Sequence, residues 1–327
     1  LKGIEYMDIV KDYKKVIEIT LGEVVASPDF FVSVGAIDYG YIIDNGCILP
    51  FYIKKKFLFR YMIFSTGILN CSSSEQEQVF LDRLIPFVKE SFKIDFILSQ
   101  HVNALFSIVP PRSQYCLFGS YILDLSLTED DIWAKMHSKH RNVIRKAEKD
   151  GVIITCGDDN KEECIKLVQN TLLRQGIAPI NDNVFSNLGN VKYVDYWLAT
   201  LNNGIEGGAI IYWHPNCGAY YMYGGSGEKP HTGSMNLLQW NVIKKMKENN
   251  VKFYDFMGAR MNPEVGSKYE GIQRFKERFG GELKKGYLWK YSLNDFKYWL
   301  YRLLVFIYSK GHFHGDIIDQ ERKRGNI

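Results

Sequence analysis

The chain has 327 residues, of which 46% are hydrophobic and 24% are charged. These values indicate a globular protein with enough chain for two domains of ordinary size. A net charge of +4 is too small to indicate a nucleic-acid-binding protein unless the basic residues cluster. The first residues lack the pattern of a signal peptide, and no apolar run reaches the ~20 residues needed to span a bilayer. We therefore expect a cytoplasmic protein, with peripheral contact at the inner face of the membrane left open and the oligomeric state undetermined.

The cysteines and histidines do not form a metal-binding pattern. The six cysteines are scattered without a CxxC pair, so free and mostly buried thiols are expected. His312 and His314 form an HxH pair with no further ligand nearby. We predict neither a metal ion nor a resident cofactor.

Two stretches of the chain share one order of elements. Each contains two apolar strands, a polar loop, a helix and a further apolar strand, and equivalent features lie about 160 positions apart. This order predicts two similar α/β domains with mixed sheets, related by duplication. The first stretch covers strands 48–51 and 61–65, helix 75–91 and strand 94–98; the second covers strands 208–213 and 219–223, helix 234–249 and strand 251–257.

A basic helix is predicted between the two stretches. Ser126-Leu127-Thr128-Glu129 is an N-terminal capping pattern and Gly151 is typical of a helix C-terminus, so one helix is expected over 129–150. Arg141 and Arg145 fall on the border between its buried and solvated faces. Two arginines one turn apart suit a diphosphate or an RNA backbone, and a solvated basic face is the alternative.

The segment Tyr220–Ser226 is predicted to form a strand that ends in a glycine turn. Alternation places Tyr221 and Tyr223 on one face and Tyr220 on the other. A tyrosine at such a strand end points into a cleft or packs in the core. In a cleft, its phenol could donate a hydrogen bond to an oxyanion or relay a proton.

A lysine between two phenylalanines follows the last predicted strand of the second stretch. That strand ends at Asp255 and is followed by Gly258, a polar loop and then Phe275-Lys276-Glu277-Arg278-Phe279. Lys276 is a candidate charge stabiliser in a cleft, and a solvated lysine on a terminal helix is the alternative. No histidine or carboxylate stands out as a general base.

The C-terminal segment 296–307 is apolar and aromatic but too short to span a membrane. Packing back onto a domain is expected, and contact with a membrane surface is the alternative. The tail Arg322-Lys323-Arg324 is predicted to be disordered.

Several of these segments together resemble the FemABX family of nonribosomal peptidyltransferases and the wider group of FemAB-related, GNAT-fold acyltransferases. The resemblance is specific over roughly residues 121–285, and before that it consists of element order alone. The matching segments are 123–125, 139–147, 151–152, 171–176, 223–226, 254–259 and 275–281.

The resemblance implies an architecture and an activity. The fold would be α/β, with two tandem GNAT-like domains over residues 1–125 and 126–292 and no coiled-coil arm. A helix at about 293–310 would pack back on the first domain. The activity would be an aminoacyltransferase of peptidoglycan biosynthesis, which moves an amino acid from aminoacyl-tRNA to an amine of a precursor stem peptide.

The resemblance also assigns roles to residues. Lys276 would stabilise negative charge in the transfer step, and Tyr223 would line the acceptor pocket as the second catalytic residue. The residues expected to bind substrate are Arg141, Arg145, Arg174, Asp255, Gly258 and Tyr221.

Two other functions stay open at this point. One is an acyl-CoA-dependent N-acyltransferase acting on a sugar amine or small molecule, although the loop 226–234 lacks a clear acyl-CoA pattern. The other is a non-catalytic module that binds RNA or a cell-wall precursor. The segment 27–31 is not followed by the lysine that pairs with a nucleotide diphosphate in well-known members of the family, a role that the run Lys54–Lys56 could fill.

Overall fold

The protein is a mixed α/β structure in which the strands follow one another across both halves of the molecule. The computed structural model describes residues 6–20, 22–98, 101–174, 180, 184–185, 187, 191–308 and 315–327. In these residues the strand order is β1-β2-β3-β4-β5-β13-β6-β11-β10-β9-β8-β7, with β12 paired to β6. Most neighbours are antiparallel, and two pairs, β4–β5 and β10–β11, are parallel.

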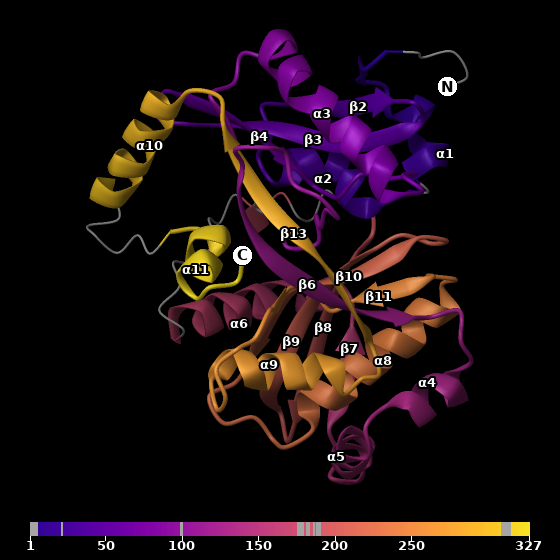
Figure 1. The fold of residues 1–327 in the computed structure, drawn as a ribbon. Coiled ribbons are helices and arrows are strands. Elements are labelled where there is room, and N and C mark those ends of the chain that lie inside the picture. The colour runs from indigo at the N-terminus through magenta and orange to yellow at the C-terminus, as the bar shows by residue number, and fades with distance from the viewer. Residues whose placement is uncertain are drawn as a thin grey trace.

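The N-terminal half is an antiparallel meander followed by a helix and a parallel strand (Figure 1). Helix α3 begins after Ser73, whose hydroxyl accepts a hydrogen bond from the Gln76 amide, and covers one face of the sheet. The strands are β1 (Asp8–Val10), β2 (Asp38–Asp44), β3 (Cys47–Lys56), β4 (Phe59–Phe64) and β5 (Phe96–Leu98), and the helices are α1 (Ile17–Thr20), α2 (Pro28–Ser33) and α3 (Ser74–Ser91).

The C-terminal half repeats this order. Helices α6 and α8 cover opposite faces of the central strands β8, β9 and β10. The strands are β6 (Gln114–Asp124), β7 (Ile153–Cys156), β8 (Val194–Leu201), β9 (Gly204–Trp213), β10 (Gly218–Ser226), β11 (Phe253–Asp255) and β12 (Ala259–Arg260). The helices are α4 (Glu129–Lys135), α5 (Ser138–Lys149), α6 (Lys161–Arg174), α8 (Ser234–Glu248) and α9 (Lys268–Glu277).

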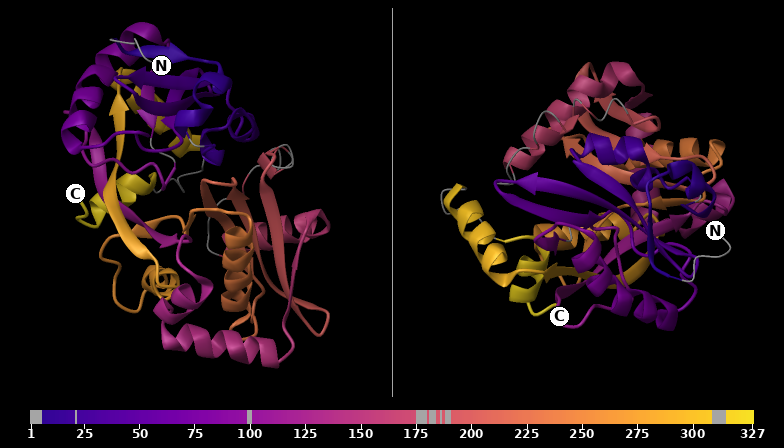
Figure 2. Two further views of the ribbon diagram at one scale, coloured as in Figure 1. Left: turned by 90° about the vertical axis from the view of Figure 1, so that its right-hand side faces the viewer. Right: turned by 90° about the horizontal axis from the view of Figure 1, so that it is seen from above.

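One long strand, β13 (Glu282–Ser292), joins the two halves. Its residues Glu282–Lys290 pair with β6, and Tyr291 and Ser292 pair with β5. The left view in Figure 2 shows it running from the lower half of the molecule into the upper one. The halves are therefore held together by main-chain hydrogen bonds as well as by side-chain packing.

The predicted fold class is confirmed. In each half a meander leads to a helix and then to a strand parallel to the last meander strand: β4–α3–β5 in the first and β10–α8–β11 in the second. The described residues contain no coiled-coil arm. The domain limits 1–125 and 126–292 stay a prediction.

The single helix expected over 129–150 is wrong. Two helices, α4 and α5, are separated at Met136 and His137, both of which have extended backbone. The His137 amide donates to the Arg278 carbonyl at 2.9 Å, and Arg141 donates to the free carbonyls at the end of α4. These tertiary contacts supply hydrogen-bond partners for the backbone groups at the break between the two helices. No local sequence pattern indicates them. The predicted C-terminal end of the helical region is confirmed, because Gly151 adopts a φ of 87° directly after the C-cap Asp150.

The C-terminal segment 296–307 packs back onto the N-terminal half, as predicted, and the basic tail after it is ordered. Helix α10 (Asp295–Tyr308) places Tyr301 against Phe59 and Tyr61 of β4 and Phe96 of β5. Helix α11 (Ile317–Lys323) contains two residues of the tail Arg322-Lys323-Arg324 and begins with a capping box at Asp316. The disorder predicted for this tail is therefore wrong.

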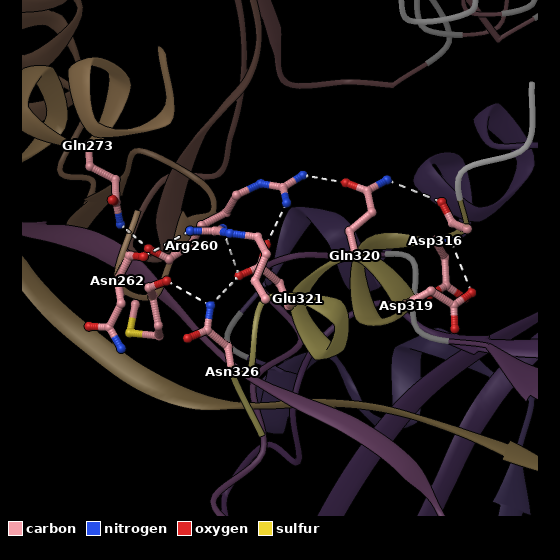
Figure 3. Close-up of polar contacts among 11 residues, drawn as sticks. Arg260, Asn262, Gln273, Asp316, Asp319, Gln320, Glu321 and Asn326 are labelled. Atoms are coloured by element: carbon pink, nitrogen blue, oxygen red, sulfur yellow. Dashed lines mark hydrogen bonds and ion pairs between the residues drawn. The ribbon is translucent and has the colours of Figure 1, made fainter. Parts of the chain in front are cut away.

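Buried charges attach α11 to the sheet (Figure 3). Glu321 is fully buried and pairs with Arg260 at 2.5 Å and with Arg324 at 3.0 Å. The amide of Asn326 donates to the same carboxylate at 2.7 Å. Lys290 of β13 is also buried, between Asp316 and Asp319 at 2.8 and 2.7 Å. Basic partners surround the buried carboxylate of Glu321, and the tail is ordered against the sheet with Arg322 and Arg324 half-buried and Lys323 exposed.

The predicted absence of a membrane-spanning helix and of disulfides can be compared with the structure. Among the described residues no helix has the length and apolar character to cross a bilayer. All six cysteines are free thiols, and four of them are buried. His312 and His314 lie outside the described residues; within the described ranges, no group of three potential ligands could hold a metal.

Replacing Glu321 should destabilise the protein strongly. Glu321→Ala leaves Arg260 without its buried partner, and we expect a loss of about 3–5 kcal/mol in the free energy of unfolding. Glu248→Ala is the matched control, because Glu248 forms an exposed pair with Lys245 and should cost less than about 1 kcal/mol. Urea denaturation followed by circular dichroism measures both. Equal effects of the two substitutions would contradict this role of Glu321.

Candidate functional site

A cavity of about 570 Å³ lies where β10, α6 and α9 meet. The end of β10 forms one wall with Tyr221 and Gly224–Ser226, and α9 forms another with Phe275 and Lys276. The walls are mostly apolar with a few polar groups, which is typical of a ligand site. The remaining lining residues are Thr171, Met222, Met235, Phe256, Met257, Lys268, Gly271 and Ile272.

Lys276 is the buried cation of this cavity. Its side chain is 9% exposed, and its ammonium donates to the carbonyl oxygens of Met257 and, at 2.7 Å, of Gly258. Burial lowers the pKa of Lys276 to about 8, and the nearby charge of Asp255 opposes that shift. The group is therefore mostly charged at neutral pH. An ammonium has three N–H donors, so one is left for a ligand.

The two carbonyls that hold Lys276 come from a left-handed turn. Met257 and Gly258 both have positive φ, 55° and 61°. A methionine rarely adopts this conformation, and here the Met257 amide is fixed by a 2.7 Å hydrogen bond to the carboxylate of Asp255. Asp255 thus holds the turn, and the turn holds the lysine.

The helix that carries Lys276 is fixed from both sides. His140 of α5 donates from Nε2 to the Phe275 carbonyl at 3.0 Å, and its ring packs on Phe279. Burial lowers the pKa of His140 to about 4, so the imidazole is neutral. On the other side, Gln273 donates to the carbonyl of Arg260, whose guanidinium binds α11 (Figure 3).

Tyr221 lies against Gly224 in the wall of the cavity. A Cβ at Gly224 would meet the Tyr221 hydroxyl at 1.8 Å, so only glycine leaves room for the phenol there. Burial raises the pKa of Tyr221 to about 12, which keeps the phenol protonated and able to donate.

The expected alternation along β10 is wrong. A bulge at Met222 shifts the register, because Tyr221 pairs with Ile211 while Tyr223 pairs with Ile210. Tyr223 therefore packs with Tyr220 in the core shared by both halves. The centroid of its ring lies 5.7 Å from the ring centroid of Phe185. It does not line the cavity of Lys276. The sequence contains nothing that distinguishes a bulged strand from a regular one.

The three predicted arginines lie in different places. Arg174 is at the rim of the cavity, where it donates to the Thr171 hydroxyl at 2.9 Å and to the Ser226 carbonyl. Arg141 is engaged with the end of α4, and Arg145 is exposed with its guanidinium 5.2 Å from the ring of Trp133. The structure does not bring Arg141 or Arg145 to the cavity. Gln175 and Gly176, which ended the matching segment 171–176, lie outside the described residues.

Asp255 and Gly258 flank the cavity without lining it. Gly258 contributes the carbonyl that Lys276 contacts. Asp255 is buried, accepts a hydrogen bond from Ser120 and lines a second cavity of about 320 Å³ on the other side of the turn. Burial raises its pKa, and hydrogen bonds and Lys276 oppose that shift.

Sequence reasoning missed Glu23. It is 6% exposed and lines the second cavity, and burial raises its pKa to about 7. The signal available was weak: one acid before the apolar run Val24-Val25-Ala26. Such a residue is more often an exposed loop acid than a buried one.

Comparisons with known proteins show one similar family and several similar folds. The FemAB family model matches residues 205–305, a range that contains Tyr221, Asp255 and Lys276. The solved structure of FemX is 16% identical with a TM-score of 0.63, and the match covers 90% of this chain and 99% of that one. No curated protein sequence matches.

The chain is similar to the FemAB family over residues 205–305 and shares its overall fold with FemX. Two further structures share the fold over 90% of the chain. The C-terminal domain of a putative lysylphosphatidylglycerol synthetase from Agrobacterium fabrum is 15% identical, with a TM-score of 0.54 and 98% of that domain covered. L-PGS from Bacillus licheniformis is 12% identical, with a TM-score of 0.51 and 95% covered. At the level of the family, the FemAB match supports a transferase of the acyltransferase class.

Proposed function

We propose that this FemABX-like protein is an N-acyltransferase that moves an amino acid from aminoacyl-tRNA to an amine of a peptidoglycan precursor stem peptide. One observation carries the proposal: the buried ammonium of Lys276 faces a 570 Å³ cavity within the segment that matches the FemAB family.

The chemistry needs a donor for developing negative charge. The amine nitrogen attacks the ester carbonyl carbon, and the carbonyl oxygen becomes an oxyanion. The C–O bond to the ribose then breaks, and the ribose oxygen takes a proton while the amine loses one. Lys276 and the Tyr221 phenol are the donors at the cavity, and in an apolar enclosure such donors act strongly.

The outer face of α5 suits an RNA donor. Lys139, Arg145 and Lys149 are exposed along it, and their charges would attract a phosphate backbone at modest ionic strength. These side chains would help the RNA to reach and orient on the protein, because they do not line the cavity where transfer would take place.

Replacing Lys276 should abolish most of the transfer. Lys276→Met keeps the aliphatic stem and removes the charge, so we expect the rate of amide formation to fall ~10²–10³-fold. The assay supplies aminoacyl-tRNA and a UDP-linked muropeptide, with acyl-CoA in a parallel reaction, and detects the product by mass spectrometry.

Lys268→Met is the matched control, because Lys268 lines the same cavity but is exposed, and it should keep most of the wild-type rate. A folded Lys276→Met protein with full activity would remove the lysine from the mechanism. Product formed with acyl-CoA and not with aminoacyl-tRNA would show that acyl-CoA is the donor.

Two of the tyrosines of β10, Tyr221 and Tyr223, should differ in their effect on transfer. Tyr221→Phe removes a donor from the cavity wall and should lower the rate on the order of 10²-fold. Tyr223→Phe removes a hydroxyl on the other face of the strand and should leave the rate near that of the wild type. Single-turnover kinetics of both variants decide between them, and the reverse order of effects would restore Tyr223 as the catalytic phenol.

A further inference from the structure

Helix α10 is apolar on two opposite faces. One face packs on the N-terminal half through Tyr301, which is 9% exposed. The opposite face carries Phe296, Trp299, Leu303 and Ile307, which are 70%, 58%, 38% and 60% exposed. These four positions recur at intervals of three and four residues, so they form one stripe along the helix. A helix that is apolar on all sides is normally buried, but Figure 1 shows α10 at the outer edge of the molecule.

The turn between β3 and β4 extends the stripe beyond the end of the helix. The ring of Phe57 in this turn lies 6.0 Å, centroid to centroid, from the ring of Tyr308, the last residue of α10. Leu58 follows Phe57 and is 88% exposed. The stripe and the turn together form an exposed apolar surface, which we call the α10 surface. Contiguous apolar patches of this kind mark sites of contact with other molecules.

Three consecutive lysines adjoin the α10 surface. Lys54, Lys55 and Lys56 end strand β3 directly before Phe57. The ammonium of Lys56 lies 5.7 Å from the centroid of the Phe57 ring, and Lys55 is exposed. Burial and the charge of Lys56 lower the pKa of Lys54. Within the part of the chain that the structure describes, none of the three lysines forms an ion pair, so their charges are available to an anionic partner.

Two further basic side chains flank the stripe on α10 itself. A helix turns by about 100° per residue, so Lys297 and Arg302 lie on opposite sides of the stripe. They pair with Asp95 at 2.6 Å and Asp319 at 3.4 Å, and their side chains are still 51% and 41% exposed. The acid on this helix is Asp295, in its first turn. An apolar stripe with basic side chains along both edges is typical of a helix that lies in a membrane interface.

We propose that the α10 surface rests on an anionic lipid bilayer, with α10 parallel to the membrane plane. The stripe and Leu58 would enter the boundary between headgroups and acyl chains, and Lys54–Lys56 would face the lipid phosphates. A protein partner fits less well, because lysines are depleted at the centre of protein interfaces. With 14 residues, α10 is too short to cross a bilayer. The proposal does not depend on the transfer reaction, because membrane binding is measured without a donor or an acceptor.

Pelleting of the whole protein with sucrose-loaded vesicles tests the charge requirement. The protein should bind vesicles made of equal amounts of phosphatidylglycerol and phosphatidylcholine. Vesicles of phosphatidylcholine alone should bind it at least about tenfold more weakly, because they lack the negative surface potential that attracts the lysines. Sodium chloride at about 0.5 M should release most of the protein from the anionic vesicles.

One pair of substitutions tests the apolar part of the surface. Leu58→Ser removes an apolar side chain from the β3–β4 turn and should raise the lipid concentration needed for half-maximal binding about fivefold or more. Val265→Ser is the matched control, because Val265 is 94% exposed but lies outside the α10 surface, and it should leave binding unchanged. Both positions are almost fully exposed, so both variants should fold, which circular dichroism checks.

Fluorescence locates the contact on the protein. Trp299 is the exposed one of the six tryptophans, so lipids with brominated acyl chains should quench it when the protein binds. Trp299→Phe keeps an aromatic ring on the stripe and should abolish most of this quenching while the protein still binds.

Three results would overturn the proposal: no binding to anionic vesicles, equal effects of Leu58→Ser and Val265→Ser, or quenching that persists in Trp299→Phe. Sedimentation velocity tests the competing occupant, a second copy of the chain. A dimer that Leu58→Ser dissociates, in a protein that does not bind vesicles, would assign the surface to that copy and would also overturn the proposal.

Discussion

The structure of the candidate site depends on how one buried ammonium is held. Lys276 donates to two carbonyls that point toward it only because Met257 and Gly258 adopt left-handed conformations. The Asp255 carboxylate fixes that turn and supplies the opposite charge that makes a buried lysine tolerable. Without the turn, desolvation would favour the neutral amine, and the cavity would lose its positive charge.

The rest of the fold keeps this arrangement in place. Strand β13 joins the halves through its pairing with β6 and β5, and β6 pairs with β11, which ends at Asp255. Helix α9 is fixed by the neutral imidazole of His140 on one side and by the α11 network on the other. Two cavities therefore lie on either side of one short turn, with Lys276 lining one and Asp255 lining the other.

The order of elements and the position of Lys276 in a cavity could be predicted, because hydrophobic patterns and capping residues are local signals. The bulge at Met222 could not be predicted, since it depends on pairing with β9. Because of this bulge, Tyr221 lines the cavity and Tyr223 does not. The break between α4 and α5 depends on Arg278, more than a hundred positions away. Glu23 and Glu321 were missed for a related reason: a lone acid in the sequence carries no sign of the partners that bury it.

Lys276 is buried beside Asp255 and is still mostly charged near neutral pH. The most direct test is an NMR titration of the Lys276 side chain, with ¹³C-labelled lysine and Lys276→Met to assign the signal. We expect the ammonium of Lys276 to titrate with a pKa of about 8. A titration at about 10.4, the value of a solvated lysine, would contradict it.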